Sequence, residues 1–264
     1  MNKFISNSQH ADDYIAWQLL GKKANGIVIE VGAFDGKHLS NSYGLSQLGW
    51  KSICIEPNPI IFKYLIKNRP DAVNINKAIV GDENIFEIEF FSEEIGVLSG
   101  CTYDDEDIKR RYKNRGLEYN EPKKIVVQAI TLNTLCDTLK INDIDLLSID
   151  VEGFELEVLK GFSLSKFKVN LFIIEANNQK DKDAILNFFK PYSEYVFIGN
   201  NFQNLFFMRK NAIKKRYLRN LDYSNYIKAK QCHPVDEKFV IDSVSPEFVK
   251  SSECIQIQKY LFVL

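Results

Sequence analysis

The sequence lacks the features that mark several classes of protein. Its formal net charge is −1, which argues against a dedicated nucleic-acid-binding protein. Its five cysteines are scattered and form no Cys-x-x-Cys pair, so neither a zinc cluster nor a disulfide framework is expected, and a reducing compartment is predicted. No segment reaches the ~18 apolar residues of a membrane span. We therefore expect a cytoplasmic protein with no membrane span.

The chain has no internal repeat, low-complexity stretch or flexible linker, so one domain with an appendage is favoured over two domains. Continuous apolar runs flanked by glycine or proline predict strands buried on both faces. They fall at residues 26–32, 51–57, 72–80, 144–150 and 169–176. Helical spacing predicts helices at 59–68, 131–140, 152–161 and 182–191. Further strands are expected at 84–91 and 124–130, and a hairpin at 192–210.

Strands that alternate with helices predict an α/β fold with a mostly parallel sheet covered on both faces. Ligands of such sheets bind beyond the carboxyl ends of the strands. The first of these ends, within "VIEVGAFDGKHLSNS" (28–42), carries Glu30 inside an apolar run. A lone acid there requires a partner.

A dinucleotide is a poor candidate for that partner. The Gly-x-Gly-x-x-Gly motif lets the backbone approach a pyrophosphate. Here Gly32 and Gly36 are spaced as Gly-x-x-x-Gly, and Phe34 stands where the second glycine belongs. A cationic nucleoside without phosphate fits better, and S-adenosylmethionine is such a ligand.

The acids at the strand ends can each contact one part of S-adenosylmethionine. Glu30 is predicted to hold its amino group, Glu56 its two ribose hydroxyls and Asp82 its adenine amino group. Gly32 is expected to let the backbone come close to it. The predicted cofactor-binding residues are Gln9, Glu30, Gly32, Ala33, Asp35, Gly36, Ser40, Asn41, Glu56, Pro57, Asn58, Ala78, Ile79, Asp82 and Asp150.

Five segments together resemble the motifs of the FkbM-type S-adenosylmethionine-dependent methyltransferases. They are "SQHADDYIAWQLL" (8–20), "IEVGAFDGKHLSNS" (29–42), "ICIEPNP" (53–59), "NKAIVGD" (76–82) and "LLSIDVEGFELEVLKGF" (146–162). The first departs from the usual Ser-Gln-x-Gly-Glu-Asp, with Ala11 in place of glycine and Asp12 in place of glutamate. The resemblance implies a class I methyltransferase fold, a seven-stranded sheet whose last strand is antiparallel. It also implies O-methylation, commonly of sugars.

Methyl transfer to a sugar hydroxyl needs a group that removes the hydroxyl proton, because sugar hydroxyls are weak acids. Asp150 and Glu175 at strand ends, and His233 in the tail, are the catalytic candidates. In metal-dependent relatives of this fold an acid after strand four and an acid plus an amide after strand five hold a divalent cation. Asp150, Glu175 and Asn177 would form that set for Mg²⁺ or Mn²⁺. A metal-free base is the favoured alternative.

Two further segments are candidates for contacts with the acceptor substrate. Residues 92–124 form a long polar insert, predicted to be a lid or substrate loop. Its basic residues Lys109, Arg110, Arg111 and Arg115 either pair with the preceding acids or grip a phosphate. Residues 211–264 are expected to form a helical appendage on the substrate side or in a homodimer.

The predicted acceptor is a nucleotide-activated sugar or another saccharide for surface polysaccharide or glycoconjugate biosynthesis. Base-methylating enzymes carry an [DNS]PP[YF] or Pro-Cys motif, and neither occurs, so no nucleic-acid partner is expected. Two alternatives stay open at this point: an NAD-dependent oxidoreductase or epimerase, and a non-catalytic binding module with the same fold.

Overall fold

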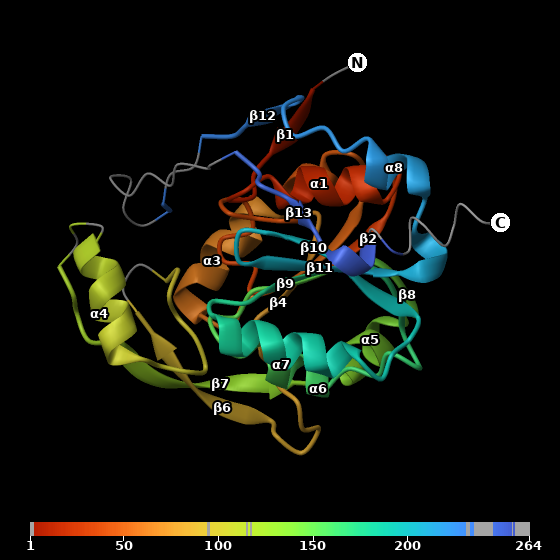
Figure 1. Ribbon diagram of the computed structural model, residues 1–264. Coiled ribbons are helices and arrows are strands. Elements are labelled where there is room, and N and C mark those ends of the chain that lie inside the picture. The colour runs from red at the N-terminus through yellow and green to blue at the C-terminus, as the bar shows by residue number, and fades with distance from the viewer. Residues whose placement is uncertain are drawn as a thin grey trace.

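The predicted alternation of strands and helices produces a sheet with helices on both faces (Figure 1). The computed structural model describes residues 3–93, 96–114, 116, 118–230, 233–234, 245–254 and 256. Across the central sheet the strands are β13 (Val249–Lys250), β10 (Tyr195–Asn201), β11 (Asn204–Arg209), β9 (Lys168–Glu175), β8 (Asp143–Ile149), β2 (Ile27–Val31), β3 (Lys51–Ile55) and β4 (Val73–Ile75).

The pairing confirms the sheet that the family resemblance implies. β4, β3, β2, β8 and β9 run parallel to their neighbours. β11 lies antiparallel between β9 and β10, as the predicted hairpin requires. The short edge strand β13 adds an eighth strand that was not expected from the sequence.

Alternate residues of the parallel strands face two different helical layers. Ile29 and Val31 of β2 pack in the core formed with α5 (Leu132–Leu139), α6 (Glu155–Lys160) and α7 (Gln179–Phe189). Val28 faces the opposite core, beneath α1 (Asp12–Leu19) and α2 (Tyr43–Ser46). α3 (Pro59–Asn68) covers β3 on that second face through Leu65 and Cys54. Because side chains alternate along a strand, Glu30 faces the α1 and α3 side.

Local capping explains where the helices begin. Asn58 accepts hydrogen bonds from the backbone N–H groups of Ile60 (3.0 Å) and Ile61 (3.4 Å), and Pro59 follows as the first helical residue. The predicted helix at 152–161 begins only at Glu155. Its first residues cannot be helical, because Glu152 has φ 53° and Gly153 has φ 94°.

The predicted third strand, 72–80, divides into two strands in different sheets. After β4 the chain bends, and β5 (Ala78–Ile79) pairs with β7 (Lys123–Ile130), which pairs with β6 (Glu87–Ser92). The insert between β6 and β7 contains α4 (Asp105–Asn114). Figure 1 shows β6, β7 and α4 beside and below the central sheet.

The N-terminal strand pairs with a strand of the tail beside α1. β12 (Tyr226–Lys228) pairs in parallel with β1 (Phe4–Ser6). The tail before it contains the 3-10 helix η1 (Lys210–Ala212) and α8 (Lys215–Arg219). The Gln18 side-chain amide donates to the carbonyl of Asp222 (2.7 Å) and accepts from its N–H (2.8 Å). Much of the remaining predicted appendage lies outside the described residues. Within the described part, no helix has the length and apolar character needed to cross a membrane.

Two glycines with positive φ offer a test of how tightly the glycine-rich loop packs on α3. A Cβ on Gly36 (φ +74°) would lie 2.3 Å from Leu65 Cδ1 and 2.6 Å from Arg69 Cγ. A Cβ on Gly116 (φ +66°) would meet nothing within 4 Å. Both alanine variants bear the backbone strain of about 1 kcal/mol, but only Gly36→Ala adds an overpacking cost of about 1–3 kcal/mol. Urea unfolding should therefore show a larger loss of stability for Gly36→Ala, and equal losses would contradict this packing.

Candidate active site

A cavity of about 1040 Å³, partly open to solvent, lies at the carboxyl ends of β2, β3, β8 and β9. Most of the predicted site residues line it: Gln9, Glu30, Gly32, Ala33, Asn41, Glu56, Pro57, Ala78, Ile79, Asp150 and Glu175. This is the position at which parallel α/β sheets bind ligands.

Glu30 holds the loop that follows β2. One carboxylate oxygen accepts from the hydroxyls of Ser40 (2.8 Å) and Ser42 (2.5 Å). The other accepts from the backbone N–H of Asn41 (2.5 Å). Burial raises the pKa of Glu30, and the hydrogen bond from Ser42 and the charge of Arg69 oppose that rise. The partner that a buried acid requires is therefore supplied largely by the protein's own loop.

The glycine at the end of β2 is required by the protein's own backbone. Gly32 has φ +83°, and a Cβ there would lie 1.7 Å from the carbonyl oxygen of Asp150. Any side chain would therefore separate β2 from β8 at the cavity wall. The expected reason, close approach of a ligand, is not needed to explain this glycine.

Glu56 is fixed from behind by two backbone amides. Its Oε2 accepts from the N–H of Phe34 (3.0 Å), and its Oε1 accepts from the N–H of Asn58 (2.7 Å). Each oxygen keeps a further acceptor position, and the side chain lines the cavity. Burial raises the pKa of Glu56 to about 8, although both amides lower it.

Several predicted cofactor-binding residues build the walls instead of lining the cavity. Ser40 donates to Glu30, and Asn58 caps α3. Gly36 packs against α3. Asp35 is fully buried and accepts from the backbone N–H groups of Lys37 and His38.

Asp82, which was predicted to bind the adenine amino group, does not line the cavity. Asp82 is exposed and accepts hydrogen bonds from Asn84 in a turn. The cause is the division of the third strand, since β5 leaves the central sheet and takes Asp82 with it. Ala78 and Ile79, just before this turn, do line the cavity.

His233, the predicted catalytic histidine, and His38 differ in their position relative to the cavity. His233 is buried and does not line the cavity; its ring lies 5.6 Å from that of Phe34. A direct catalytic role for His233 therefore has no geometric support. His38 does line the cavity, and its Nδ1 lies 2.6 Å from a carboxylate oxygen of Asp35.

Asp12 is a cavity residue that was not among the predicted sites. Its carboxylate is buried and accepts from the side-chain amides of Asn201 (2.7 Å) and Asn204 (3.0 Å). Burial, which the two amides oppose, raises the pKa of Asp12 to about 7. Asn204 also lines the cavity and lies directly opposite Glu175 in the β9–β11 pairing. In the sequence, the only feature that pointed to this residue was the aspartate at position 12, where the family motif usually has glutamate.

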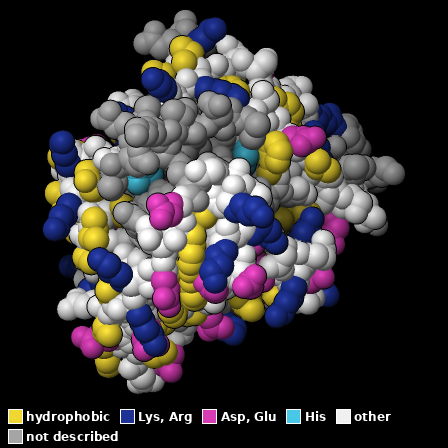
Figure 2. Space-filling model, turned by 90° about the vertical axis from the view of Figure 1, so that its left-hand side faces the viewer, with side chains coloured by type: hydrophobic (Ala, Val, Ile, Leu, Met, Phe, Trp, Pro, Cys, Tyr) yellow, Lys and Arg dark blue, Asp and Glu magenta, His cyan; other side chains and the backbone are white. Residues whose placement is uncertain are grey.

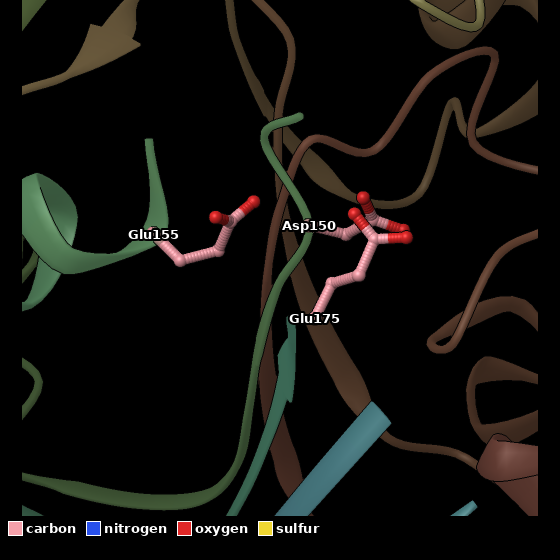
Figure 3. Close-up of side chains that lie close together, drawn as sticks. All are labelled: Asp150, Glu155 and Glu175. Carbon is pink, nitrogen blue, oxygen red and sulfur yellow. The ribbon is translucent and has the colours of Figure 1, made fainter. Parts of the chain in front are cut away.

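Asp150 and Glu175 form a carboxyl pair at the ends of β8 and β9 (Figure 3). Their side chains hydrogen-bond to each other, so one of them carries a proton. Burial raises both pKa values, and the shared hydrogen bond lowers that of Asp150 but raises that of Glu175. The shared hydrogen bond thus favours the ionised form of Asp150 over that of Glu175.

The predicted divalent-cation ligands do not make a suitable set. Asp150, Glu155 and Glu175 offer oxygens within 4.8 Å of one another. One oxygen of Glu155, Oε1, accepts from the backbone N–H groups of Val151 (3.0 Å) and Gly153 (3.1 Å). Asn177, the predicted third ligand, directs its NH₂ group at Glu175 (2.9 Å). An NH₂ group cannot ligate Mg²⁺ or Mn²⁺, which require oxygen.

A guanidinium group from the insert stands beside this carboxyl pair. Arg111 of α4 pairs with Glu152 (3.1 Å) and Asp107 (2.7 Å). Its charge lowers the pKa of Asp150. Two other basic residues of α4 form ion pairs as well, Lys109 with Asp105 and Arg110 with Asp107. The ion-paired helix is thus the correct alternative for these residues, while Arg115 lies outside the described residues.

The strand order and the acid-lined cavity define a class I S-adenosylmethionine-dependent methyltransferase. The family model "Methyltransferase FkbM domain" matches residues 30–222. The chain therefore belongs to the FkbM methyltransferase family. This membership decides against both the NAD-dependent oxidoreductase and the non-catalytic module.

Solved structures with a similar fold are distant in sequence. The precorrin-6y C5,15-methyltransferase of Geobacter metallireducens has 11% identity and a TM-score of 0.41, with 78% of this chain and 90% of that chain covered. The O-methyltransferase of Bacillus cereus, solved with S-adenosylhomocysteine, has 10% identity and a TM-score of 0.39, with 77% and 80% covered. No match is found among the curated proteins.

The cavity fits the cofactor that the family implies. Its acids, among them Glu30, Glu56 and Asp150, suit a ligand with a sulfonium and an ammonium group and disfavour a pyrophosphate. The amide of Phe34, at the position that a pyrophosphate would approach, is already bound to Glu56.

If Glu56 binds the ribose as predicted, its raised pKa should make cofactor binding depend on pH. Ribose hydroxyls donate to the ionised carboxylate, so a proton on Glu56 competes with them. With a folded pKa of about 8, the affinity for S-adenosylhomocysteine should rise roughly tenfold from pH 7 to well above pH 8. Calorimetry should show this rise in the native protein and a flat, weaker profile in Glu56→Gln.

The exposed Glu83→Gln is the matched control and should behave as the native protein. The same pH dependence in Glu56→Gln would remove Glu56 from the cofactor site.

Proposed function

We propose that the protein transfers the methyl group of S-adenosylmethionine to a hydroxyl oxygen of a saccharide. The observation that carries the proposal is the pair of Asp150 and Glu175, which lines the same cavity as Glu56 and the loop held by Glu30. This pair places a proton acceptor where the cofactor's reactive end is expected.

The bound cofactor supplies an electrophilic methyl group on sulfur. The protein has to hold the acceptor hydroxyl in line with it and take up the proton. In this scheme Asp150 is ionised, and it accepts the hydroxyl proton as the new carbon–oxygen bond forms and the carbon–sulfur bond breaks. Glu175 donates a hydrogen bond to Asp150 and thereby fixes its orientation.

The positive charge near the reacting atoms comes from Arg111. Its charge acts on both Asp150 and Glu175. It lowers the pKa of Asp150 and so favours the ionised form of this carboxyl group. No step of this scheme requires a divalent cation.

A saccharide is the acceptor class that the cavity favours. Its wall beyond Asp150 carries hydrogen-bonding groups of Asp12, Asn204 and Glu152. Hydroxyl-rich ligands are recognised by such carboxylates and amides. Incubation with isotope-labelled S-adenosylmethionine and a saccharide panel, read by mass spectrometry, tests the proposal. Addition of a methyl group to no saccharide, while the cofactor binds, would refute it.

The substitution Asp150→Asn tests the role of this carboxylate. It keeps the size of the side chain but removes the group that takes up the proton, so turnover with the methylated saccharide should fall ~100-fold or more. The melting temperature and the affinity for S-adenosylhomocysteine should stay near those of the native protein. EDTA should leave the native turnover unchanged. Loss of activity in EDTA with recovery on Mg²⁺ or Mn²⁺ would replace this scheme with a metal-dependent one.

A further inference from the structure

A second cavity, of about 930 Å³, adjoins the first and lies between α4 and the first turn of α7. It is lined by Leu98, Thr102, Asp104, Asp107, Ile108, Arg110, Arg111, Glu152, Gly153, Asn177, Asn178 and Asp181. Glu152 lines both cavities, two residues after Asp150. We call this second cavity the α4–α7 cleft.

The α4–α7 cleft is polar and carries more acid than base. Four carboxylates (Asp104, Asp107, Glu152 and Asp181) line it against two guanidinium groups. Burial raises the pKa of Glu152 to about 8, yet with Glu152 neutral three carboxylates still face two cations. Figure 2 shows Lys and Arg side chains interspersed with Asp and Glu over the α4 side of the molecule, with no large patch of one sign.

Both guanidinium groups of the cleft are already committed to carboxylates. Arg110 pairs with Asp107. Arg111 pairs with Asp107 and Glu152 and reaches the side-chain oxygen of Asn177 (3.4 Å). A phosphate bound here would have to compete with Asp107 and Glu152 for Arg111.

We infer that the α4–α7 cleft is the acceptor subsite and that it selects a saccharide free of phosphate over a sugar phosphate or a nucleotide-linked sugar. The inference rests on the proposed function and narrows its substrate class. Glu152 lines both cavities, so an acceptor that extends past it can present a hydroxyl to the carboxyl pair. Its carboxylates accept hydrogen bonds from hydroxyl or ammonium groups and repel phosphate.

The test compares one panel of hexoses and deoxyhexoses in four chemical forms: methyl glycosides, 2-amino sugars, 1-phosphates and uridine diphosphate conjugates. Methyl transfer from labelled S-adenosylmethionine is measured as kcat/KM for each. The phosphate-free forms should exceed the phosphorylated forms of the same sugar by at least about tenfold, as expected for a like-charge penalty.

A double variant connects this preference to the cleft. Asp104→Asn with Asp181→Asn removes two charges that pair with neither arginine, and asparagine preserves the cap that Asp104 provides to the N–H of Asp107. The ratio between phosphate-free and phosphorylated forms should fall severalfold. Asp143→Asn, an exposed site at the opposite end of β8, is the matched control and should leave the ratio unchanged.

The outcomes distinguish a failure of this inference from a failure of the proposed function. A preference for phosphorylated sugars, or a ratio that the double variant does not alter, would overturn the inference and leave the proposed function standing. If no sugar in any form is methylated while S-adenosylhomocysteine still binds, the proposed function fails and the inference fails with it.

Discussion

The buried carboxylate of Glu30 organises the loop on which the cofactor site depends. A charge inside a strand is costly unless hydrogen bonds satisfy it. Glu30 satisfies its charge with Ser40, Asn41 and Ser42, and the Arg69 guanidinium binds the same loop at Ser42 and at the Gly36 carbonyl (2.9 Å). The loop is thus tied to β2 and to the end of α3 at once. Its residues Gly32 to Phe34 are thereby held over β3, where the amide of Phe34 fixes Glu56.

The cavity concentrates acids whose pKa values are raised by burial. Glu56, Asp12, Asp150 and Glu175 all share this effect. Raised pKa values of neighbouring carboxyl groups are typical of sites that handle protons or bind cations. A ligand that carries a sulfonium and an ammonium group relieves the cost of burying these acids. The same acids therefore explain the preference for this cofactor over a dinucleotide.

Arg111 connects the insert to the chemistry. It belongs to α4, between two strands of a small sheet outside the central one, yet its charge acts on Asp150 and Glu175. Its pairing with Glu152 joins the cofactor cavity to the α4–α7 cleft. One side chain thus contributes to the ionisation of the base and to the polarity of the acceptor cleft. The insert consequently contributes to the electrostatics of the cavity that Asp150 and Glu175 line.

The sequence by itself determined the class of fold and most of the cofactor wall. Continuous apolar runs and helical spacing are local signals, and they predicted the parallel strands, the hairpin and the acids Glu30, Glu56 and Asp150 at strand ends. Only the tertiary structure decided the rest. The division of the third strand moved Asp82 away, because β5 found its partner in β7, which is distant in sequence. Asn204 reached Asp12, and Arg111 reached Glu152, across long stretches of chain. Periodicity cannot reveal such contacts, because they depend on which strands pair and on where the insert packs.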